Sequence, residues 1–280
     1  MKKRKEISLG HSPDPDDAFM FHPLARNQIE TGGLIFRHIL QDIQTLNERT
    51  MRGELDVSAI SIHAYPQVAA NYALMPCGAS MGDGYGPMVV APRPCDTDVL
   101  RRMTIAVPGT LTSAFLALRL CIGEFDYRVI PFDKIFEALQ KGDAEAGLII
   151  HEGQLTYWKE KLHCIVDLGA WWKKQTGLPL PLGGNVIKKS LGPVLVKKIT
   201  AIVRQSIAHA LAHADEAIPH VMPYARDLDA DLTKKFVRMY VNDYTLDYGE
   251  KGRAAVREFL DRGHAAGMIR EKFDLEFVEL

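Results

Sequence analysis

Short apolar runs alternate with amphipathic stretches along the first part of the chain. Three runs have the length and composition of buried strands: residues 7–10, 34–39 and 57–62. Helical patterns separate them, one beginning near Ala18 and one over residues 42–51, and Gly53 suits the left-handed position that follows a helix. This alternation predicts an α/β fold with a mostly parallel sheet and helices on its faces.

The same rhythm begins again after residue 100. Strand patterns at residues 104–107, 129–130 and 145–150 alternate with helical patterns at residues 114–120 and 134–140. In the first half a helix ends at Gly53 and its strand leads to His63, and in the second half a helix ends at Gly142 and its strand leads to His151. Two similar α/β lobes explain this repetition, although helix–glycine–strand is also a common unit by itself.

Two segments that combine Gly and Pro with apolar residues, 82–90 and 178–186, are typical of crossover connections between lobes. Later helical patterns cover residues 199–217, 231–240 and 250–266, and we expect them to pack on the first lobe. The predicted organisation is a larger, discontinuous lobe of residues 1–90 and 186–280 and a smaller lobe of residues 91–185, with a cleft between them.

Composition and charge narrow the function classes. The 280 residues are 47% hydrophobic and 25% charged with a formal net charge of -1, so no basic excess attracts nucleic acid. No run reaches the roughly 18 apolar residues of a membrane helix. The basic residues 1–6 are not followed by the apolar stretch of a secretory signal, and we therefore expect a cytoplasmic protein that binds neither nucleic acid nor membrane.

His151 ends a buried-strand pattern, and Glu152 and Gly153 follow it at once. Ligands of α/β proteins bind outside the carboxyl ends of such strands, and imidazole titrates near neutrality. His151 is therefore a candidate for proton transfer. The alternative is a hydrogen-bonded structural histidine.

A second candidate site is the loop of residues 108–114 between a strand and a helix. Thr112 and Ser113, with backbone N–H groups at a helix N-terminus, suit an anion such as a substrate carboxylate. The alternative is that one hydroxyl only caps the helix. The loop lacks the Gly-x-Gly-x-x-Gly and Walker patterns, so nucleotide binding is not indicated.

The sequence gives weaker evidence for a metal site or for a cysteine-based site than for the two candidates above. Asp14, Asp16 and Asp17 form an acidic strand-to-helix turn, where carboxylates suit either a hard cation or the turn and helix N-terminus themselves. We expect the structural role and no metal. The four cysteines contain no Cys-x-x-Cys pair, so neither a structural zinc nor a disulfide framework is expected.

Two aromatic pairs have ambiguous roles. His209 and His213 lie four residues apart on a predicted helix without the Glu of a zinc-protease motif, and we expect packing or surface roles. Trp171 and Trp172 suit either an apolar pocket or the core.

Several of these segments together resemble the 1,4-dihydroxy-6-naphthoate synthases of the futalosine route of menaquinone biosynthesis. The most specific segment is residues 167–183, which contains Trp171 and Trp172. Further similar segments occur in the same order along most of the chain: residues 86–91, 106–109, 146–152, 240–242 and 246–247.

The resemblance implies a two-lobed fold like the type II periplasmic binding proteins, with a mixed sheet in each lobe and the active site in the cleft. It implies a cofactor-free lyase that acts on cyclic dehypoxanthine futalosine, a small-molecule carboxylate, with His151 as the general base. It also implies six residues that contact the substrate: Ala59, Ile60, Ser61, Thr112, Ser113 and Ala114. No oligomeric state follows from it.

The chain departs from the family pattern at two places. Its N-terminal turn has Asp14, Asp16 and Ala18 where the family usually has Cys, Asn and Thr, and Ala59 replaces a lysine that is common before the substrate-binding serine. Added negative and lost positive charge disfavour a carboxylate ligand, unless nearby histidines compensate; the candidates are His11, His22 and His63.

Two alternatives share the fold but differ in function. One is a non-catalytic solute-binding protein, which requires export. The other is the related enzyme that dehydrates chorismate, which the His151–Glu152–Gly153 segment and the tryptophan pair disfavour.

Overall fold

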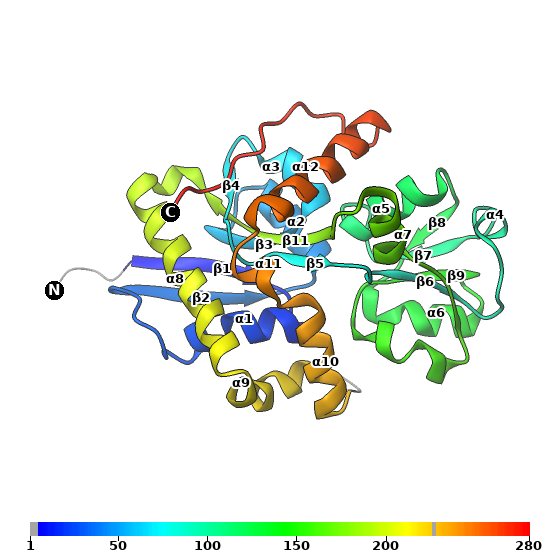
Figure 1. Cartoon of the computed structure of the whole chain (residues 1–280), viewed down its shortest axis with the longest axis horizontal. Helices are drawn as coiled ribbons and strands as arrows, with labels where there is room; N and C mark the ends of the chain where they lie inside the picture. The colour runs from blue at the N-terminus through cyan, green and yellow to red at the C-terminus, as the bar shows by residue number, and fades with distance from the viewer. Residues whose placement is uncertain (1–4, 226–227) are drawn as a thin grey trace. The chain divides into compact units, whose positions relative to one another are not determined.

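The computed structural model describes residues 5–225 and 228–280 (Figure 1). It confirms the predicted α/β class with a mixed sheet in each of two compact units. Unit 1 contains the chain through Ser80, Gly183–Glu250 and Glu271–Leu280, and unit 2 contains Met81–Leu182 and Lys251–Arg270. Residues 1–4, part of the basic N-terminal segment, lie outside the described residues. The lobe limits predicted at residues 90 and 185 stay a prediction.

The sheet of unit 1 has the strand order β2-β1-β3-β11-β4, and β5 pairs with β11. Its strands are β1 (Lys5–His11), β2 (Leu34–Leu40), β3 (Val57–Ser61), β4 (Tyr72–Leu74), β5 (Ser80–Gly82) and β11 (Leu180–Lys188). β1 is parallel to both β2 and β3, whereas β11 is antiparallel to β3 and β4. The carboxyl ends of β1 and β3 therefore lie at one edge of the sheet.

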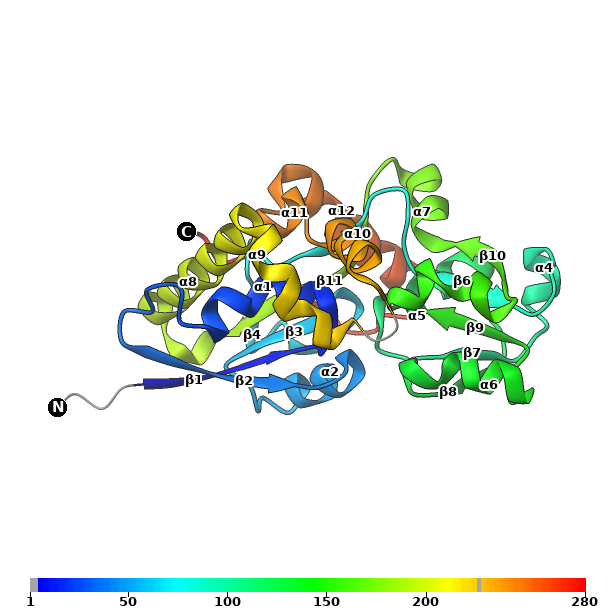
Figure 2. The same cartoon turned by 90° about the horizontal axis from the view of Figure 1, so that it is seen from below.

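The helices of unit 1 are α1 (Pro15–Ala25), α2 (Ile43–Met51), α3 (Tyr65–Val68), α8 (Pro193–Ala212), α9 (Ala214–Val221), α10 (Ala230–Tyr240) and α11 (Asp243–Leu246). α1 packs against α8, α9 and α10, as Figure 2 shows. The largest core joins Ile7 and Leu9 of β1 to Phe19 of α1 and Ile199 of α8. Burial of these apolar side chains is the main stabilising contribution in this unit.

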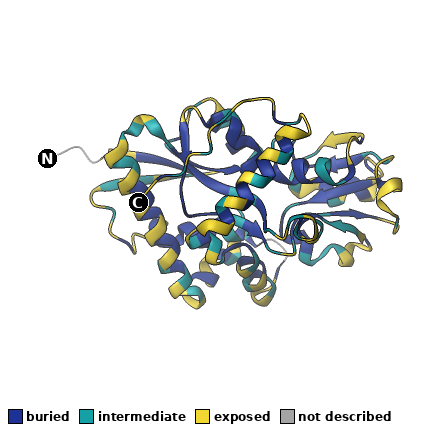
Figure 3. Cartoon of the chain, turned by 45° about the horizontal axis from the view of Figure 1, so that its top comes forward, coloured by how far each residue is buried: buried dark blue, intermediate teal, exposed yellow. Residues whose placement is uncertain are grey.

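The sheet of unit 2 has the order β10-β6-β9-β7-β8. Its strands are β6 (Met88–Ala91), β7 (Ile105–Val107), β8 (Tyr127–Val129), β9 (Ala146–Ile149) and β10 (His163–Asp167), and its helices are α4 (Thr97–Leu100), α5 (Ser113–Ile122), α6 (Ile135–Lys141), α7 (Leu168–Thr176) and α12 (Gly249–Ala265). β7 is parallel to β8 and β9, and β6 is antiparallel to β9 and β10. Figure 3 shows that the central strands of this unit are buried.

Short 3-10 helices follow several strands and loops: η1 (Ile62–Ala64), η2 (Phe132–Lys134), η3 (Glu152–Leu155), η4 (Tyr157–Glu160), η5 (Lys189–Leu191) and η6 (Met222–Tyr224). Among the described residues, no helix combines the length and the apolar content that crossing a bilayer requires.

The chain passes from one unit to the other at or beside both predicted crossover segments, but each segment also contains a strand that the local patterns did not predict. Residues 88–91 are strand β6, and Leu180–Lys188 is the nine-residue strand β11. Both pair antiparallel, so the sheets are mixed, as the resemblance implied, and the mostly parallel sheet predicted from the local alternation was wrong. The sequence of β11 did not predict a strand because it contains Gly183 and Gly184. Glycine is uncommon inside strands unless close packing requires it. A Cβ on Gly184 would lie 2.3 Å from the Tyr248 hydroxyl oxygen.

The predicted C-terminal helices also differ in detail. The helix expected over residues 199–217 is interrupted at His213, where α8 ends and α9 begins. Residues 251–270, which contain most of α12, group with unit 2 rather than with unit 1. The ring of Phe259 in α12 contacts Trp172 edge-on, with the ring centroids 5.4 Å apart.

Candidate functional site

His151 lies at the carboxyl edge of the sheet in unit 2. It follows strand β9, and its neighbour in the sheet is the parallel strand β7, after which Thr112 begins α5. The two candidate segments therefore emerge at the same edge of one sheet, where α/β proteins bind ligands. His151 is only 8% exposed.

The imidazole of His151 is held by a backbone group and two phenyl rings. The Gly153 N–H donates a hydrogen bond to His151 Nδ1 at 2.9 Å, which makes His151 the N-cap of η3. The rings of Phe132 and Phe136 contact the imidazole edge-on, with centroids 5.6 and 5.8 Å away. Both the structural and the functional interpretation of a buried histidine fit these contacts.

Gly153 leaves the space that the imidazole fills. A Cβ at this position would lie 2.6 Å from His151 Cε1 and 2.8 Å from Phe136 Cζ. Glu152 is 3% exposed, and its Oε2 lies 3.9 Å from His151 Nδ1, which is beyond hydrogen-bond distance. The sequence order His-Glu-Gly thus places a carboxylate near the ring and a glycine against it.

Thr112 caps helix α5, as one of the sequence interpretations expected. Its hydroxyl accepts the Phe115 N–H at 3.2 Å and donates to the Gly109 carbonyl at 2.8 Å. The Ser113 hydroxyl donates to the Leu182 carbonyl at 2.5 Å. Both hydroxyl protons are thus directed at carbonyl groups, so an anion at this helix end would have to be held by backbone N–H groups and the helix dipole.

The candidate residues of unit 1, Ala59, Ile60 and Ser61, lie in the central strand β3. Ala59 packs with Leu46 and Leu55, and Ile60 is fully buried. Ser61 is held by Asn47 of α2: the Ser61 N–H donates to Asn47 Oδ1 at 2.8 Å, and Asn47 Nδ2 donates to Ser61 Oγ at 3.1 Å. The apolar cluster around Ala59 explains how this position tolerates a small apolar side chain.

The acidic turn is organised by Asp17 in the first turn of α1. Its Oδ2 accepts the Ser12 N–H at 2.6 Å. Burial raises the pKa of the Asp17 carboxyl to about 6, although the bond from Ser12 opposes the shift. Within the described residues, no group of three or more His, Cys, Asp or Glu side chains could hold a metal ion. These contacts fit the structural interpretation of the turn.

His11, at the end of β1, forms a hydrogen-bonded pair with His38 of β2. His11 Nδ1 lies 3.1 Å from the Ser12 carbonyl oxygen, and its Nε2 lies 3.0 Å from His38 Nδ1. A carbonyl only accepts, so the neutral His11 carries its proton on Nδ1 and accepts from His38. Burial, and then the neighbouring His38, lower the pKa of His11 to about 4.

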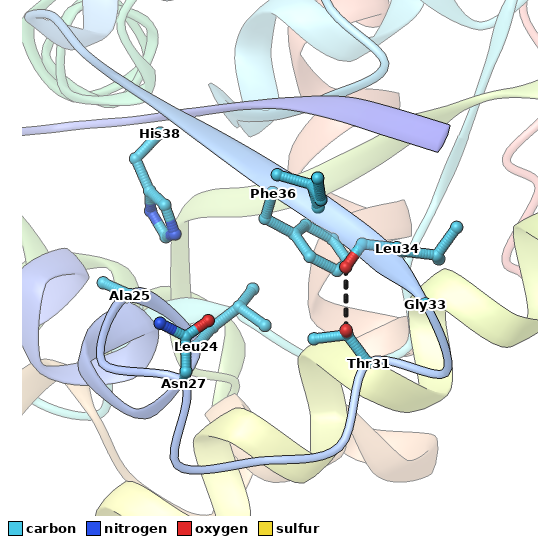
Figure 4. Close-up of a pocket in the computed structure, with 9 residues that line it drawn as sticks. Leu24, Ala25, Asn27, Thr31, Gly33, Leu34, Phe36 and His38 are labelled. Atoms are coloured by element: carbon cyan, nitrogen blue, oxygen red, sulfur yellow. Dashed lines mark hydrogen bonds between the residues drawn. The ribbon is translucent and has the colours of Figure 1, made fainter. Parts of the chain in front are cut away.

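His38 also lines a cavity of about 420 Å³ between the end of α1 and the edge strand β2 (Figure 4). Leu34 and Phe36 form its apolar wall, and the Thr31 hydroxyl donates to the Leu34 carbonyl at 2.7 Å. His38 Nε2 is buried and has no hydrogen-bond partner among the described residues. None of the six predicted substrate contacts lines this cavity.

The remaining candidates lie in buried or ring-stacked positions. Trp172 is fully buried, and its Nε1–H donates to the Pro179 carbonyl at 3.1 Å. The rings of His209 and His213 stack on each other at the end of α8, 4.2 Å apart. His22 stacks on His220 at 4.4 Å, and His63 is buried in η1.

The cysteines are free, but only Cys77 is buried, and Cys164 is exposed. Cys164 lies on the edge strand β10, which leaves it accessible to solvent.

Three residues that hold the candidates were not identified from the sequence. Asn47 binds Ser61, and Phe132 and Phe136 contact His151. An Asn inside an amphipathic helix is a usable signal, because polar side chains are rarely buried there without a specific partner. Phe132 of η2 and Phe136 of α6 have no such signal, because their sequence patterns are those of ordinary core residues.

Comparison with known families places most of the chain in one group. The family described as "Menaquinone biosynthesis" matches residues 7–265. A 1,4-dihydroxy-6-naphthoate synthase of Thermus thermophilus is 39% identical over 205 residues, which are 73% of this chain and 74% of that protein. The enzyme of the same name from Streptomyces coelicolor is 36% identical over 269 residues, or 94% of each chain.

Solved structures agree on the fold. A protein from Archaeoglobus fulgidus is 42% identical, has a TM-score of 0.91 and covers 94% of this chain and 98% of its own. A Candida albicans protein described as having the generic periplasmic binding protein fold has a TM-score of 0.70 at 14% identity, with 98% of each chain covered. The periplasmic-binding-protein-like fold predicted from the sequence is confirmed.

Proposed function

The chain belongs to the menaquinone biosynthesis family, and on that premise we propose that it is a carbon–carbon lyase that forms 1,4-dihydroxy-6-naphthoate from cyclic dehypoxanthine futalosine. The family match over residues 7–265 and two synthases with at least 36% identity support an enzyme of this biosynthesis. The substrate and the lyase step are our proposal.

The observation that carries the proposal is the setting of His151. It is nearly buried at the carboxyl edge of the unit 2 sheet, beside the segment that begins α5. This is where a proton-transferring group of an α/β enzyme is expected. The resemblance assigns His151 the role of general base in a retro-aldol-like fragmentation that releases a three-carbon piece. General-base catalysis typically contributes a factor of ~10²–10⁴.

The substrate carboxylate is proposed to bind at the start of α5. Thr112, Ser113 and Ala114 occupy the N-cap and first helical positions, where backbone N–H groups and the helix dipole favour an anion. The assignment of Ala59, Ile60 and Ser61 to substrate contact stays a prediction drawn from the resemblance. No cofactor is part of the proposed reaction.

Incubation of the purified protein with cyclic dehypoxanthine futalosine, followed by mass spectrometry, tests the proposal. We expect 1,4-dihydroxy-6-naphthoate to form, and His151→Ala to lower the rate by a factor of about 10²–10⁴ without unfolding the chain. Chorismate serves as the competing substrate. Turnover of chorismate alone, or binding of metabolites without any turnover, would contradict the proposed reaction.

A further inference from the structure

The side-chain amide of Asn47 determines how the hydroxyl group of Ser61 can form hydrogen bonds. Asn47 lies in α2 and is fully buried, and its amide contacts two groups of Ser61 at the end of β3. A backbone N–H only donates, so the Ser61 N–H selects the amide oxygen as its acceptor, at 2.8 Å. The amide nitrogen is thereby directed at Ser61 Oγ, 3.1 Å away.

This arrangement makes Ser61 a hydrogen-bond donor toward any ligand. The amide nitrogen of Asn47 only donates, so Ser61 Oγ accepts from it, and the hydroxyl proton of Ser61 points away from Asn47. We propose that Asn47 is a positioning residue, which presents the Ser61 hydroxyl as the donor to an uncharged oxygen of the substrate, a carbonyl or a hydroxyl group. The proposal rests on the proposed function, in which Ser61 contacts the substrate.

The turn that follows Ser61 does not use its side chain. Ser61 is the N-cap residue of η1, a position where a serine oxygen usually accepts a backbone N–H of the turn. Ser61 forms no such bond, and its oxygen accepts from α2 instead. Capping therefore does not explain a serine at this position, whereas donation to a ligand does.

The sheet of unit 1 leaves room beside the Ser61 side chain. Gly183 of β11 lies opposite Ser61, and opposed residues of an antiparallel pair direct their side chains to the same face. A Cβ on Gly183 would lie 3.6 Å from the Ile60 carbonyl oxygen and 3.6 Å from Ser80 Cβ, which are ordinary contacts. Packing thus does not require glycine here, and the missing side chain leaves space for a substrate oxygen at the half-buried Gly183.

The surroundings of Ser61 favour an uncharged oxygen over a carboxylate. The Asn47 amide is neutral, and β1, the parallel neighbour of β3, leads directly into the turn with Asp14, Asp16 and Asp17. Carboxylates close to this strand end repel a second anion. The substrate carboxylate is therefore assigned to the start of α5, as proposed above, and Ser61 to another oxygen of the same molecule.

A double-mutant cycle on Asn47 and Ser61 tests the proposal. Asn47→Asp keeps an acceptor for the Ser61 N–H, but the new carboxylate accepts the Ser61 hydroxyl proton and withdraws it from the substrate. We expect the KM for cyclic dehypoxanthine futalosine to rise about three- to tenfold, the worth of one neutral hydrogen bond, with kcat changed less. Ser61→Ala should have a similar effect, and Asn47→Asp in the Ser61→Ala background should add less than about twofold.

The pH dependence of KM separates positioning from a purely structural role. A protonated carboxyl group donates to Ser61 Oγ as the amide does, so the KM of Asn47→Asp should return toward that of the wild type as the pH is lowered. Lost stability alone gives no such recovery. Glu48→Ala, at an exposed position of the same helix, is the control and should leave KM unchanged.

Each outcome of the cycle has a defined meaning. A wild-type KM in folded Asn47→Asp, or an equal effect of Asn47→Asp with and without the Ser61 hydroxyl, would overturn the proposal. Asn47→Ala gives the same cycle if circular dichroism shows that Asn47→Asp does not fold. If the wild-type protein does not convert the substrate, the proposed function fails and this inference fails with it. If it converts the substrate without coupling between the two sites, only the role of Asn47 fails.

Discussion

Asn47 of helix α2 and Ser61 at the end of strand β3 are joined by two hydrogen bonds. Asn47 Oδ1 accepts the Ser61 N–H at 2.8 Å, and Asn47 Nδ2 donates to Ser61 Oγ at 3.1 Å. Asn47 is fully buried and Ser61 is 3% exposed. The pair fixes the direction in which the chain leaves the central strand of unit 1.

Replacing Asn47 with Ala should destabilise the protein. The substitution leaves a buried N–H and a buried hydroxyl without their partner, which costs about 1–3 kcal/mol. Urea unfolding measures the change, and Glu48→Ala, at an exposed position of the same helix, is the control with an expected effect below about 0.5 kcal/mol. An unchanged unfolding midpoint for Asn47→Ala would show that the pair adds no stability.

His11 should make the fold sensitive to mild acid. The folded protein keeps His11 neutral to about pH 4, whereas the unfolded chain binds a proton near the ordinary value of 6.5. Its contribution is therefore fully present above pH 6.5 and is lost as the pH falls toward 4. The loss amounts to about 3 kcal/mol at most.

Urea unfolding between pH 7 and pH 4.5 tests this sensitivity. The variant His11→Gln should lose less stability over that range than the wild type, because the site no longer titrates. The exposed His264 provides the control, and His264→Gln should follow the wild-type curve. Parallel curves for wild type and His11→Gln would refute the assignment.

Asp17 should have the opposite dependence on pH. Its folded pKa of about 6 lies above the ordinary 3.8, so its contribution is present below pH 3.8 and is lost as the pH rises through 6. Asp17→Asn keeps an acceptor for the Ser12 N–H and removes the buried charge. We expect this variant to gain about 1–3 kcal/mol over the wild type at pH 8 and little at pH 4. Equal stability at pH 8 would contradict the raised pKa.

Trp172 should be a principal core residue of unit 2. It is fully buried, it contacts Phe259, and the Arg262 guanidinium lies 5.1 Å above its ring. Trp172→Ala should lower the free energy of unfolding by about 3–5 kcal/mol. Trp171→Ala, at the neighbouring half-buried position, should cost clearly less in the same denaturation experiment. The reverse order would assign the core role to Trp171.

Gly153→Ala should impair turnover more than stability. The added Cβ would lie 2.6 Å from His151 Cε1, so the imidazole must move away from its position. A displaced catalytic group typically costs about 10²-fold in rate. We expect kcat for naphthoate formation to fall while KM changes little, and thermal unfolding to confirm a folded chain. Full kcat in this variant would show that the fit between Gly153 and His151 is not required.

Local patterns predicted most elements of this fold. Hydrophobic periodicity, apolar content and helix-capping residues depend only on neighbouring residues, so β3, α5 and β9 could be predicted from the sequence. Gly53 has the expected left-handed conformation, with a φ of 68°. The local patterns likewise predicted that Thr112 follows the strand that is β7 and that His151 follows the strand that is β9. These features follow from backbone geometry that a short segment determines by itself.

Tertiary structure alone decided the partners. β11 pairs with β3 across more than a hundred residues, and α12 groups with unit 2, because packing of distant surfaces has no counterpart in local periodicity. The Asn47–Ser61 pair depends in the same way on how α2 packs beside β3. The sequence could show that His151 ends a strand. Which groups surround its imidazole depends on the positions of Phe132, Phe136 and the Gly153 N–H, which only the folded chain determines.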